Sequence, residues 1–293
     1  MTITITPVDP VSRPDFVGRV EGVDLCQPLP ANDVAAIEAG MDRFAVLVFH
    51  DQRIDDAQQV AFASNFGTLE RATGDLAQGA DRRLSIDLAD ISNLNRDGTV
   101  MARDDRKRLF GLGNMLWHSD SSFKATPAKY SMLSARILPQ RDGNTEFADM
   151  RAAYDALDDE ERAQLEGLVC EHTQITSRGL LGFTDFTPDE FIRFAPVRQT
   201  LVRTHPVTGR KSLFLSSHAG AIEGYPVPEA RALLRDLTER ATQREFVYKH
   251  VWRTHDLVIW DNRTTLHRAR RYDPTEIRDM RRTTLESDGP TVM

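Results

Sequence analysis

The chain has 293 residues, of which 28% are charged and 40% are hydrophobic, and its formal net charge is −7. This size and composition predict one globular domain over residues 1–293, and the negative charge argues against a general nucleic-acid-binding protein. No apolar run approaches the roughly 20 residues that cross a bilayer, so we expect no membrane partner. Two cysteines, Cys26 and Cys170, are too few for a disulfide framework and predict a cytoplasmic protein. We also expect a homo-oligomer.

The first part of the chain predicts strands and helices in alternation. Residues 1–6 alternate polar and apolar side chains in the manner of an edge strand. Asn32 could cap a helix over 32–44, with its apolar side chains on one face. The apolar run 45–49 predicts a buried strand, and a second helix is expected over 55–67, with a glycine at its end.

Two long segments without a regular secondary-structure pattern predict lids over a binding site. Residues 68–113 are polar and rich in glycine, and residues 178–198 are irregular but apolar. Long segments of this kind in a compact enzyme commonly form lids or binding loops. We therefore expect lid segments at about 68–113 and 178–198. Phe183, Phe186 and Leu180 could rim an apolar pocket or could be core beneath a surface loop.

The remainder predicts further short strands with inserted helices. Strands are expected over 17–20, 88–93, 130–138, 144–150, 201–205, 212–215, 246–252, 257–260, 264–269 and 281–286. Helices are expected over 152–168 and 228–242. Short strands with helices between them favour a mainly β fold with inserted helices, namely a double-stranded β-helix or cupin-like jelly roll.

The stretch that points to chemistry is Trp117–Asp120. His118 and Asp120 are two residues apart on a predicted strand over 114–118, and such side chains share one face. A His-x-Asp pair alone is weak, because a satisfied strand histidine beside a surface acid is the more common case. His267, on a predicted strand near the other end of the chain, would supply a third ligand. Two histidines and one carboxylate form the facial triad of non-haem Fe(II) oxygenases.

Arginines follow His267 on a predicted strand over 277–282. On such a strand Arg278 and Arg282 would lie on one face. Guanidinium groups at a metal pocket are suited to bind carboxylates through paired hydrogen bonds. A solvated face is the expectation for the other arginines of this region, which are Arg268, Arg270, Arg271 and Arg281.

These residues belong to motifs that extend through most of the chain. The motifs are Trp117–Phe123, Gly143–Phe147, Asp149–Tyr154, Trp260–Arg263 and Leu266–Arg268. Together they resemble the Fe(II)/2-oxoglutarate-dependent dioxygenases of the taurine dioxygenase group, and most closely the 2,4-dichlorophenoxyacetate dioxygenases.

The resemblance implies a metal centre and a co-substrate site. His118, Asp120 and His267 would bind Fe(II), while Thr145 and Arg278 would bind 2-oxoglutarate. A lone threonine at position 145 would otherwise pass as a turn residue. The implied cofactors are therefore Fe(II), 2-oxoglutarate as co-substrate, and O2.

The resemblance also implies a set of substrate-binding residues. Arg282 would hold an anionic group of the prime substrate. Asn114, on the same predicted strand face as His118, would line the substrate side of the metal. Ser121 adjoins the metal motif. His205 and His218 are further candidates, for which a role as ordinary strand histidines is an equal alternative.

The first lid segment departs from the pattern of the phenoxyacetate enzymes. Asp75 and Thr99 stand where the resemblance predicts cations that hold the substrate carboxylate. Arg103, Arg106 and Lys107 could compensate, or they could form a solvated charge cluster.

The implied reaction hydroxylates a small anionic carboxylate of aryloxyalkanoate type and releases succinate and CO2. Hydroxylation at a carbon that bears an ether oxygen would also cleave the ether. One alternative is the same chemistry on a sulfonate or a natural-product carboxylate. Another is a jelly roll that binds zinc and an anion without redox chemistry. A serine hydrolase is disfavoured, because the sequence has no Gly-x-Ser-x-Gly motif.

Overall fold

The computed structural model of the chain describes residues 3–74, 76 and 81–292, and its largest sheet has seven strands. In spatial order these are β1 (Thr4–Pro7), β2 (Val17–Glu21), β3 (Val46–Phe49), β13 (Leu257–Asp261), β5 (Ala128–Ile137), β15 (Asp279–Glu286) and β4 (Ala89–Ser92). Neighbouring strands are antiparallel except for the parallel pair β2 and β3. From Thr4 onward, the alternating N-terminal segment forms the edge strand β1, as predicted.

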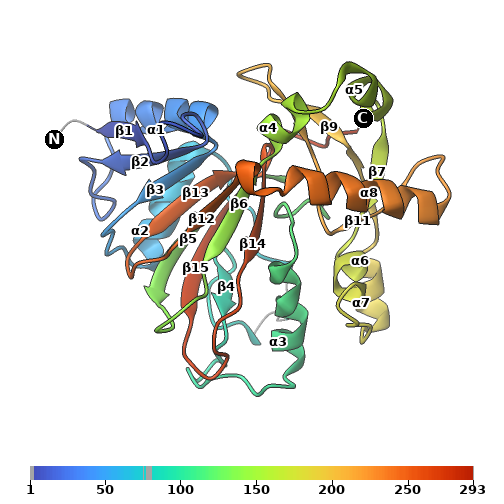
Figure 1. Cartoon of the computed structure of the whole chain (residues 1–293). Coiled ribbons are helices and arrows are strands. Elements are labelled where there is room, and N and C mark those ends of the chain that lie inside the picture. The colour runs from blue at the N-terminus through green and yellow to red at the C-terminus, as the bar shows by residue number, and fades with distance from the viewer. Residues whose placement is uncertain (1–2, 75, 77–80, 293) are drawn as a thin grey trace.

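A smaller sheet packs against the larger one and completes a sandwich (Figure 1). Its strands, in order, are β12 (Val247–His250), β6 (Thr145–Asp149) and β14 (Thr265–Ala269). Phe147 of β6 and Trp260 of β13 meet between the two sheets, with ring centroids 5.5 Å apart. Met280 of β15 is buried in the same core. This two-sheet sandwich agrees with the predicted jelly roll.

Strand β13 shows why the central strands are apolar on both faces. Val258 and Trp260 enter the core between the sheets, whereas Leu257 and Ile259 point to the opposite face, because successive side chains of a strand alternate. Helices cover that second face. They are α1 (Ala31–Phe44), α2 (Asp56–Ala63) and the short 3-10 helix η1 (Ser64–Phe66). A strand covered on both faces reads as a continuous apolar run.

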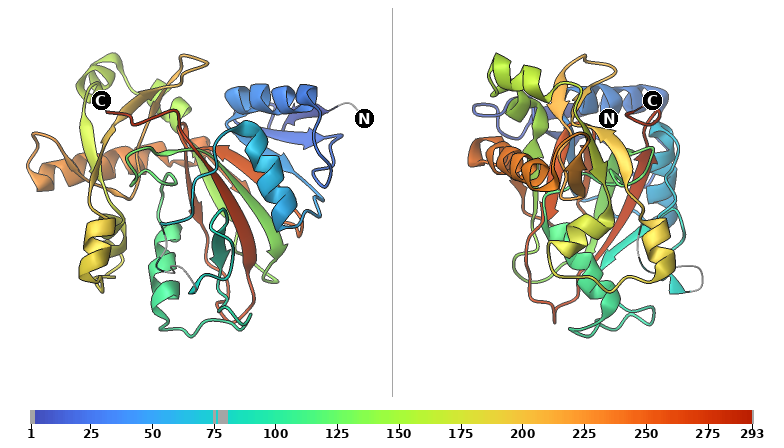
Figure 2. Two further views of the ribbon diagram at one scale, coloured as in Figure 1. Left: turned by 180° about the vertical axis from the view of Figure 1, so that it is seen from behind. Right: turned by 90° about the vertical axis from the view of Figure 1, so that its right-hand side faces the viewer.

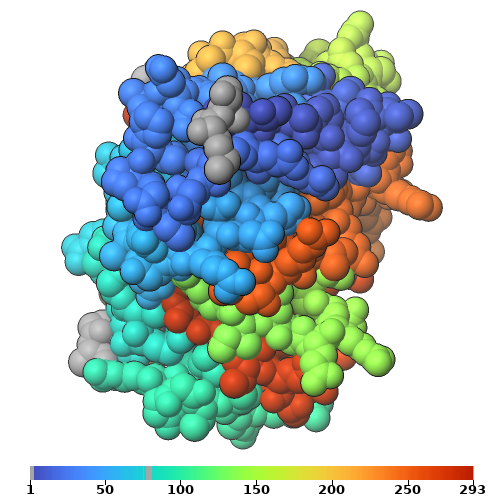
Figure 3. Space-filling model, turned by 90° about the vertical axis from the view of Figure 1, so that its left-hand side faces the viewer, coloured from blue at the N-terminus to red at the C-terminus, as the bar shows by residue number. Residues whose placement is uncertain are grey.

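The two N-terminal helices begin differently. Asn32 is not the cap of α1, because the helix already begins after Pro30, which has no side-chain capping bond. Asp55 and Gln58 form a reciprocal capping box at the start of α2, as the sequence pattern allows. Figure 3 views the molecule from this side, where the blue atoms of the N-terminal segment lie close to orange and red atoms of the C-terminal part.

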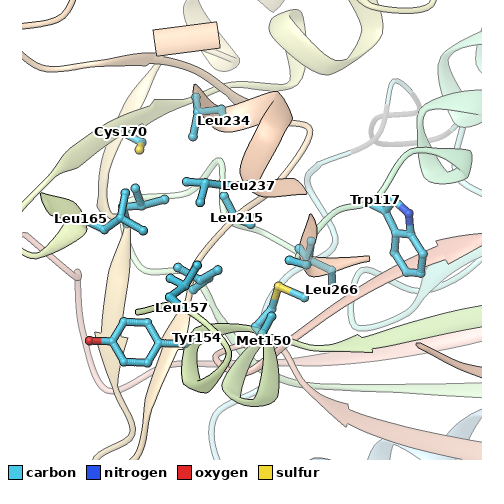
Figure 4. Close-up of a cluster of buried hydrophobic side chains, with 14 of the residues drawn as sticks. Trp117, Met150, Tyr154, Leu157, Leu165, Cys170, Leu215, Leu234, Leu237 and Leu266 are labelled. Atoms are coloured by element: carbon cyan, nitrogen blue, oxygen red, sulfur yellow. The ribbon is translucent and has the colours of Figure 1, made fainter. Parts of the chain in front are cut away.

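A second core lies beside the sandwich, under the long helix α8 (Val227–Ala241). The other elements of this half are α4 (Met150–Asp155), α5 (Asp159–Leu165), β7 (Val169–His172), β8 (Val197–Thr200), β9 (Val202–Thr204), β10 (Lys211–Leu213), β11 (Ala219–Ile222) and η4 (Arg244–Phe246). Figure 4 shows Leu234, Leu237 and Leu215 packed in this core, with Trp117 at its far edge beside Leu266. Trp117 therefore anchors the chain just before His118 by packing in this second core.

One predicted helix is in fact two. The expected helix over 152–168 is broken, because Asp158 forms a capping box with Glu161 and starts α5 as a separate helix. The predicted hairpin of β9 and β10 is present, with Val202 opposite Leu213.

Within or overlapping the two predicted lid segments lie helices that the sequence pattern did not predict. The helices are α3 (Arg106–Gly111), η3 (Leu112–Met115), α6 (Gln174–Gly179) and α7 (Pro188–Arg193). Each is too short to show a helical period. Helix α3 lies beside α6 and α7 at one end of the molecule (Figures 1 and 2). Within the described part of the chain, no helix is both long and apolar enough to cross a membrane.

Candidate active site

His118 does not lie on the predicted strand. Residues 112–115 form the 3-10 helix η3, and the chain becomes extended only from Leu116, so the expectation of a strand over 114–118 is wrong. His118 instead forms a single antiparallel bridge with His267 of β14. The two residues exchange backbone hydrogen bonds, 3.0 Å from the His118 nitrogen to the His267 oxygen and 2.9 Å in return. This reciprocal pair of bonds fixes the two backbones side by side.

The turn that follows brings Asp120 to both histidines. Its Oδ1 lies 3.9 Å from Nε2 of His118, and its Oδ2 lies 3.6 Å from Nε2 of His267. One ligand-type atom from each residue lies within 4.8 Å of the others, and all three side chains are buried. The three residues, separated by as many as 149 positions, therefore meet as the sequence motifs predicted.

The charge states of the three groups suit a divalent metal. Burial lowers the pKa of both imidazoles below its usual value, although Asp120 partly offsets this effect, so His118 and His267 are neutral at pH 7. Burial also acts to raise the pKa of Asp120, but the Arg282 guanidinium, followed by His267 and His118, outweighs it and lowers the value to about 2. The cluster therefore offers two neutral imidazoles and one carboxylate.

Neighbouring polar groups hold these side chains in place. The His118 Nδ1 lies 2.7 Å from the backbone oxygen of Leu116, which assigns the proton to Nδ1 and leaves Nε2 free toward Asp120. Ser131 donates to Oδ2 of Asp120 over 2.7 Å. Asn262 accepts from the Asp120 backbone and donates to Ser131. Ser131 was missed in the sequence, because a serine in a buried strand carries no signal of such a role.

The cluster lies at a cavity of about 920 Å³. The predicted site residues that line it are Asn114, His118, Asp120, Ser121, His218, Arg278 and Arg282. A small recess of about 30 Å³ adjoins it, where Thr145 and His267 come together with Arg278. Asn114 lines the cavity from η3 and not from a strand face shared with His118.

Arg278 is a buried cation at this recess. Its side chain is 4% exposed, and its nearest recorded acceptor is the Ile91 oxygen at 3.5 Å. Among the described residues its Nε has no hydrogen-bond partner. Burial lowers the pKa of Arg278, and nearby Tyr272 partly offsets this effect. Asn93, in the first lid segment, accepts from the Arg278 backbone over 2.9 Å and so fixes the loop before β15.

Thr145 faces Arg278 across the recess. Its Oγ1 accepts a hydrogen bond of 3.0 Å from Nε1 of Trp252, which leaves the hydroxyl proton free to donate. A guanidinium and a hydroxyl donor at one end of a buried recess can together bind a carboxylate.

Arg282 projects from β15 toward the metal cluster. Its Nη1 donates to Oδ1 of Asp120, and the ion pair is largely buried. Arg278 precedes β15, which starts at Asp279, and a register shift lies between Asp279 and Met280. The two arginines therefore share the cavity without lying on one regular strand face.

His205 lies outside this cavity. Its Nε2 is 3.3 Å from Oδ2 of Asp261 and 2.8 Å from Nη2 of Arg263, in a buried network behind β13. This position gives no support to the predicted substrate role. His218 does line the cavity, and its ring centroid is 6.0 Å from that of His118.

The apolar rim expected in the second lid segment is also absent from the cavity lining. Phe183 and Phe186 pack on Phe110 in an aromatic cluster, with ring centroids 5.7 and 6.4 Å apart from it, and Leu180 is 64% exposed. The cavity takes aromatic rings from Phe110 and from Phe123 instead. Of the two alternatives that the sequence left open, the pocket rim therefore has no support here: Phe183 and Phe186 pack in a half-buried aromatic cluster, and Leu180 lies at the surface.

The lid cations have mixed positions. Arg103 and Lys107 line the cavity, and Lys107 lies 3.4 Å from Asp90. Arg106 faces away and pairs with Glu190, 2.6 Å away, which lies on α7. Asp75 lies outside the described residues. Thr99 is in a surface turn, where it donates to Asp97.

Three of the arginines that were expected on a solvated face form ion pairs, and one of them, Arg270, lies 3.7 Å from Glu146 and is 48% exposed in its side chain. Arg281 is 12% exposed in its side chain and pairs with Asp279 and Asp56. Arg268 donates to Glu146 over 2.8 Å. The sequence pattern also missed Arg178 of α6, which is buried and lines the cavity.

Comparison with known proteins agrees with this geometry. The family model described as "Taurine catabolism dioxygenase TauD, TfdA family" matches residues 5–284. The chain is 48% identical over 289 residues to the alpha-ketoglutarate-dependent 2,4-dichlorophenoxyacetate dioxygenase of Cupriavidus pinatubonensis, covering 99% of both proteins. It is 38% identical over 261 residues to the (S)-phenoxypropionate/alpha-ketoglutarate-dioxygenase of Sphingobium herbicidovorans, covering 86% of this chain and 85% of the relative.

Solved structures give the same result. The crystal structure of AAD-2 in complex with Mn(II) and N-oxalylglycine matches with a TM-score of 0.96 and 58% sequence identity, and the match covers 100% of both chains. A second crystal structure, of a putative alpha-ketoglutarate-dependent 2,4-D dioxygenase from Burkholderia xenovorans, matches with a TM-score of 0.82 and 40% identity over 98% of each chain.

Proposed function

Because the chain belongs to the TauD/TfdA family, and is therefore a 2-oxoglutarate-dependent dioxygenase that uses Fe(II) and O2, we propose that it hydroxylates a small aryloxyalkanoate. Its relatives carry the names of 2,4-dichlorophenoxyacetate and (S)-phenoxypropionate dioxygenases. The observation that carries the proposal is the meeting of a buried two-histidine, one-carboxylate cluster with buried arginines in a single cavity.

The residues present fit a ferrous ion. We propose that Nε2 of His118, Nε2 of His267 and a carboxylate oxygen of Asp120 bind it. Both imidazoles are neutral and the carboxylate is ionised, as a metal requires of its ligands. Three ligands on one face leave positions open, which suits Fe(II) oxygenases. When bound, iron and 2-oxoglutarate supply the oxidising chemistry, and the protein supplies position and charge.

We propose that the small recess holds the far carboxylate of 2-oxoglutarate. Arg278 would pair with this carboxylate, and the Thr145 hydroxyl would donate to it. Support comes from the burial of Arg278 and from the lack of a recorded partner for its Nε among the described residues. A buried guanidinium without an anion is costly, and the co-substrate provides the anion. At the opposite end of 2-oxoglutarate, the keto acid would face the metal ligands.

The larger cavity suits the prime substrate. Phe110, Phe123 and Met101 offer apolar surface for an aryl body, and Arg282 lies on the metal side for an anionic group. Asn114, Ser121 and His218 would line the same volume. A few charged groups set among apolar walls are typical of sites for small amphiphilic acids.

In the proposed reaction, one oxygen atom of O2 enters the substrate and the other enters succinate, while 2-oxoglutarate loses CO2. If the hydroxylated carbon also bears the aryloxy oxygen, the product is a hemiacetal. Its carbon–oxygen bond then breaks, the phenol oxygen takes up the proton, and the former side chain leaves as an oxo-acid. The residues of this chain would orient the substrate so that this carbon faces the open side of the metal.

Succinate formation tests the proposal. We expect the protein with Fe(II), 2-oxoglutarate and O2 to form succinate in proportion to added phenoxyacetate or 2-phenoxypropionate, with release of phenol. An alkylsulfonate and a natural-product carboxylate would be assayed beside them, because Arg282 could pair with any of these anions. A panel in which no aryloxyalkanoate increases succinate above the substrate-free rate rejects the proposed substrate class.

The finer expectations on location and assembly remain proposals. Cys26 and Cys170 are both free thiols, which supports a reducing cytoplasmic compartment. We keep the proposals of a homo-oligomer and of one domain with lid segments at 68–113 and 178–198. Sedimentation at several concentrations measures the assembly, and limited proteolysis with and without 2-oxoglutarate tests the lids.

A further inference from the structure

We propose that Arg178 is a second cation which, together with Arg282, holds the carboxylate of the prime substrate, and this inference rests on the function proposed above. Arg178 lies near the end of α6, in the second lid segment, and its side chain lines the large cavity. Arg282 and His218 line the same cavity. A substrate carboxylate bound at Arg178 would therefore lie in the same volume as the metal cluster.

The first argument is that Arg178 has no anionic partner in the part of the chain that the structure describes. The side chain is 5% exposed. Its recorded hydrogen bond is from Nη1 to the Ser177 hydroxyl, at 2.9 Å, and its Nε has no partner among the described atoms. No carboxylate of residues 3–74, 76 and 81–292 forms an ion pair with it. A buried charge without an anionic partner destabilises the folded protein, and a bound anion removes this destabilisation.

The guanidinium is also held rigidly. Its Cζ lies 4.4 Å from the ring centroid of Phe110, which stacks a planar cation against an aromatic face. The backbone at Gly113 comes so close that a Cβ atom there would lie 2.5 Å from the same Cζ. Only a glycine at position 113 leaves room for this guanidinium. Since a pre-positioned donor loses little entropy on binding, this arrangement suits a specific carboxylate site.

A third argument comes from the other cations of the cavity. Arg282 already donates to Asp120, Lys107 lies 3.4 Å from Asp90, and Arg278 lies in the recess proposed for 2-oxoglutarate. Arg103 and Arg271 line the cavity but are exposed, and Arg108 is half-buried and donates to the backbone oxygen of Arg103. Among the described cavity residues, Arg178 is therefore the buried cation with neither a carboxylate partner nor an assigned ligand.

The position of Arg178 relative to the metal cluster fits a short acid. Ser177 accepts from Arg178 and lies 2.9 Å from Nδ1 of His218, whose ring packs edge-on to that of His118. The positive charge of Arg178 contributes to the lowered pKa of both His118 and His218. A carboxylate at Arg178 would thus sit one layer of side chains from the metal ligands.

Paired ligands test the role directly. Phenoxyacetate and its neutral amide, phenoxyacetamide, would be titrated by calorimetry into the anaerobic complex with Fe(II) and 2-oxoglutarate. We expect the wild-type protein to prefer the carboxylate, and Arg178→Gln to reduce this preference by roughly 30-fold or more, as for loss of one partner of a buried charge pair. Affinity for the amide and for 2-oxoglutarate should change by less than about threefold.

Arg203→Gln is the matched control. Arg203 is half-buried, lies 4.7 Å over the ring of Phe214 and has an unpartnered Nη1 among the described atoms, but it does not line the cavity. The Arg203→Gln variant should prefer phenoxyacetate over phenoxyacetamide to the same degree as the wild-type protein. Gly113→Ala keeps Arg178 but displaces its guanidinium, so it should also reduce the preference.

The outcomes separate two failures. An unchanged preference in Arg178→Gln, or an equal loss of affinity for both ligands, overturns the role of Arg178 and leaves the proposed function standing. A wild-type protein that shows no preference for the carboxylate rejects the aryloxyalkanoate substrate, and this inference with it. If Arg178→Gln fails to fold, Arg178→Lys and Gly113→Ala provide the same comparison, and a full preference in both overturns the inference.

Discussion

Replacing Arg278 with methionine should have opposite effects on stability and on co-substrate binding. Arg278→Met keeps most of the apolar stem and removes the charge. In the ligand-free protein this charge is buried, and its Nε lacks a partner among the described residues. Removing it should therefore leave the free energy of unfolding unchanged or increased, because replacing an uncompensated buried charge with an apolar group is neutral or stabilising.

The effect on 2-oxoglutarate has the other sign. Loss of one partner of a buried charge pair costs roughly 2 to 5 kcal/mol, and the lower value corresponds to about a 30-fold increase in Kd. At 2-oxoglutarate equal to about 100 times the wild-type Kd, ligand binding adds about 2.7 kcal/mol to wild-type stability. The same concentration adds only about 0.9 kcal/mol to the variant.

Thermal unfolding measures both effects in one experiment. For a chain of this size, about 1 kcal/mol corresponds to roughly 2 °C in Tm. We expect 2-oxoglutarate to raise the wild-type Tm by roughly 5 °C and that of Arg278→Met by roughly 2 °C, in the presence of anaerobic Fe(II). Arg203→Gln serves as a control for loss of a half-buried guanidinium elsewhere. A variant that is clearly less stable without ligand, or that keeps the full ligand-dependent shift, refutes the assignment of Arg278.

Three further predictions concern variants, and a fourth concerns the pH dependence of wild-type stability. His118→Ala and Asp120→Ala should each abolish substrate-dependent succinate formation and lower bound iron measured by metal analysis; normal turnover in either variant would remove the metal assignment. Arg282→Ala should raise the KM of the prime substrate more than that of 2-oxoglutarate, which initial-rate kinetics can compare. Asp261→Asn should lower the free energy of unfolding by about 3 to 5 kcal/mol, because it leaves the Arg263 charge buried without its partner. Burial acts to raise the pKa of Asp261, but Arg263 and His205 outweigh it and lower the pKa overall. Wild-type stability should therefore be retained above about pH 4 and fall as the pH drops below that value. Equal free energies of unfolding from urea titrations at pH 3 and pH 7 would contradict this.

The sequence predicted best where the signal is local and repeated. The apolar run at 45–49 became a central strand, and a helix begins beside Asp55 as expected. Short helices such as α3 were missed, because six residues complete too few turns to show a period. The single helix expected over 152–168 was split by Asp158, whose capping role competes with the longer apolar pattern.

The site shows the same limit. His118, Asp120 and His267 could be grouped from the sequence, because they belong to motifs that together resemble one enzyme family. Arg178 could not, because its importance depends on what surrounds it: the ring of Phe110, the backbone of Gly113 and the absence of a carboxylate among its described neighbours. Burial and lack of a partner are properties of the folded chain. No local sequence pattern reveals the burial of a side chain or its lack of a partner.

The backbone bridge between His118 and His267 has a consequence for how the protein acquires its ion. Both histidine backbones are fixed by the sandwich itself, through two hydrogen bonds that require no cation. In small zinc modules, by contrast, coordination provides the folding energy, and chelators unfold the chain. Here a chelator should extract the ion and leave a folded protein ready to be reloaded. The choice among competing divalent cations then depends on their supply in the cell and on the donor atoms, since every such ion meets the same preformed site.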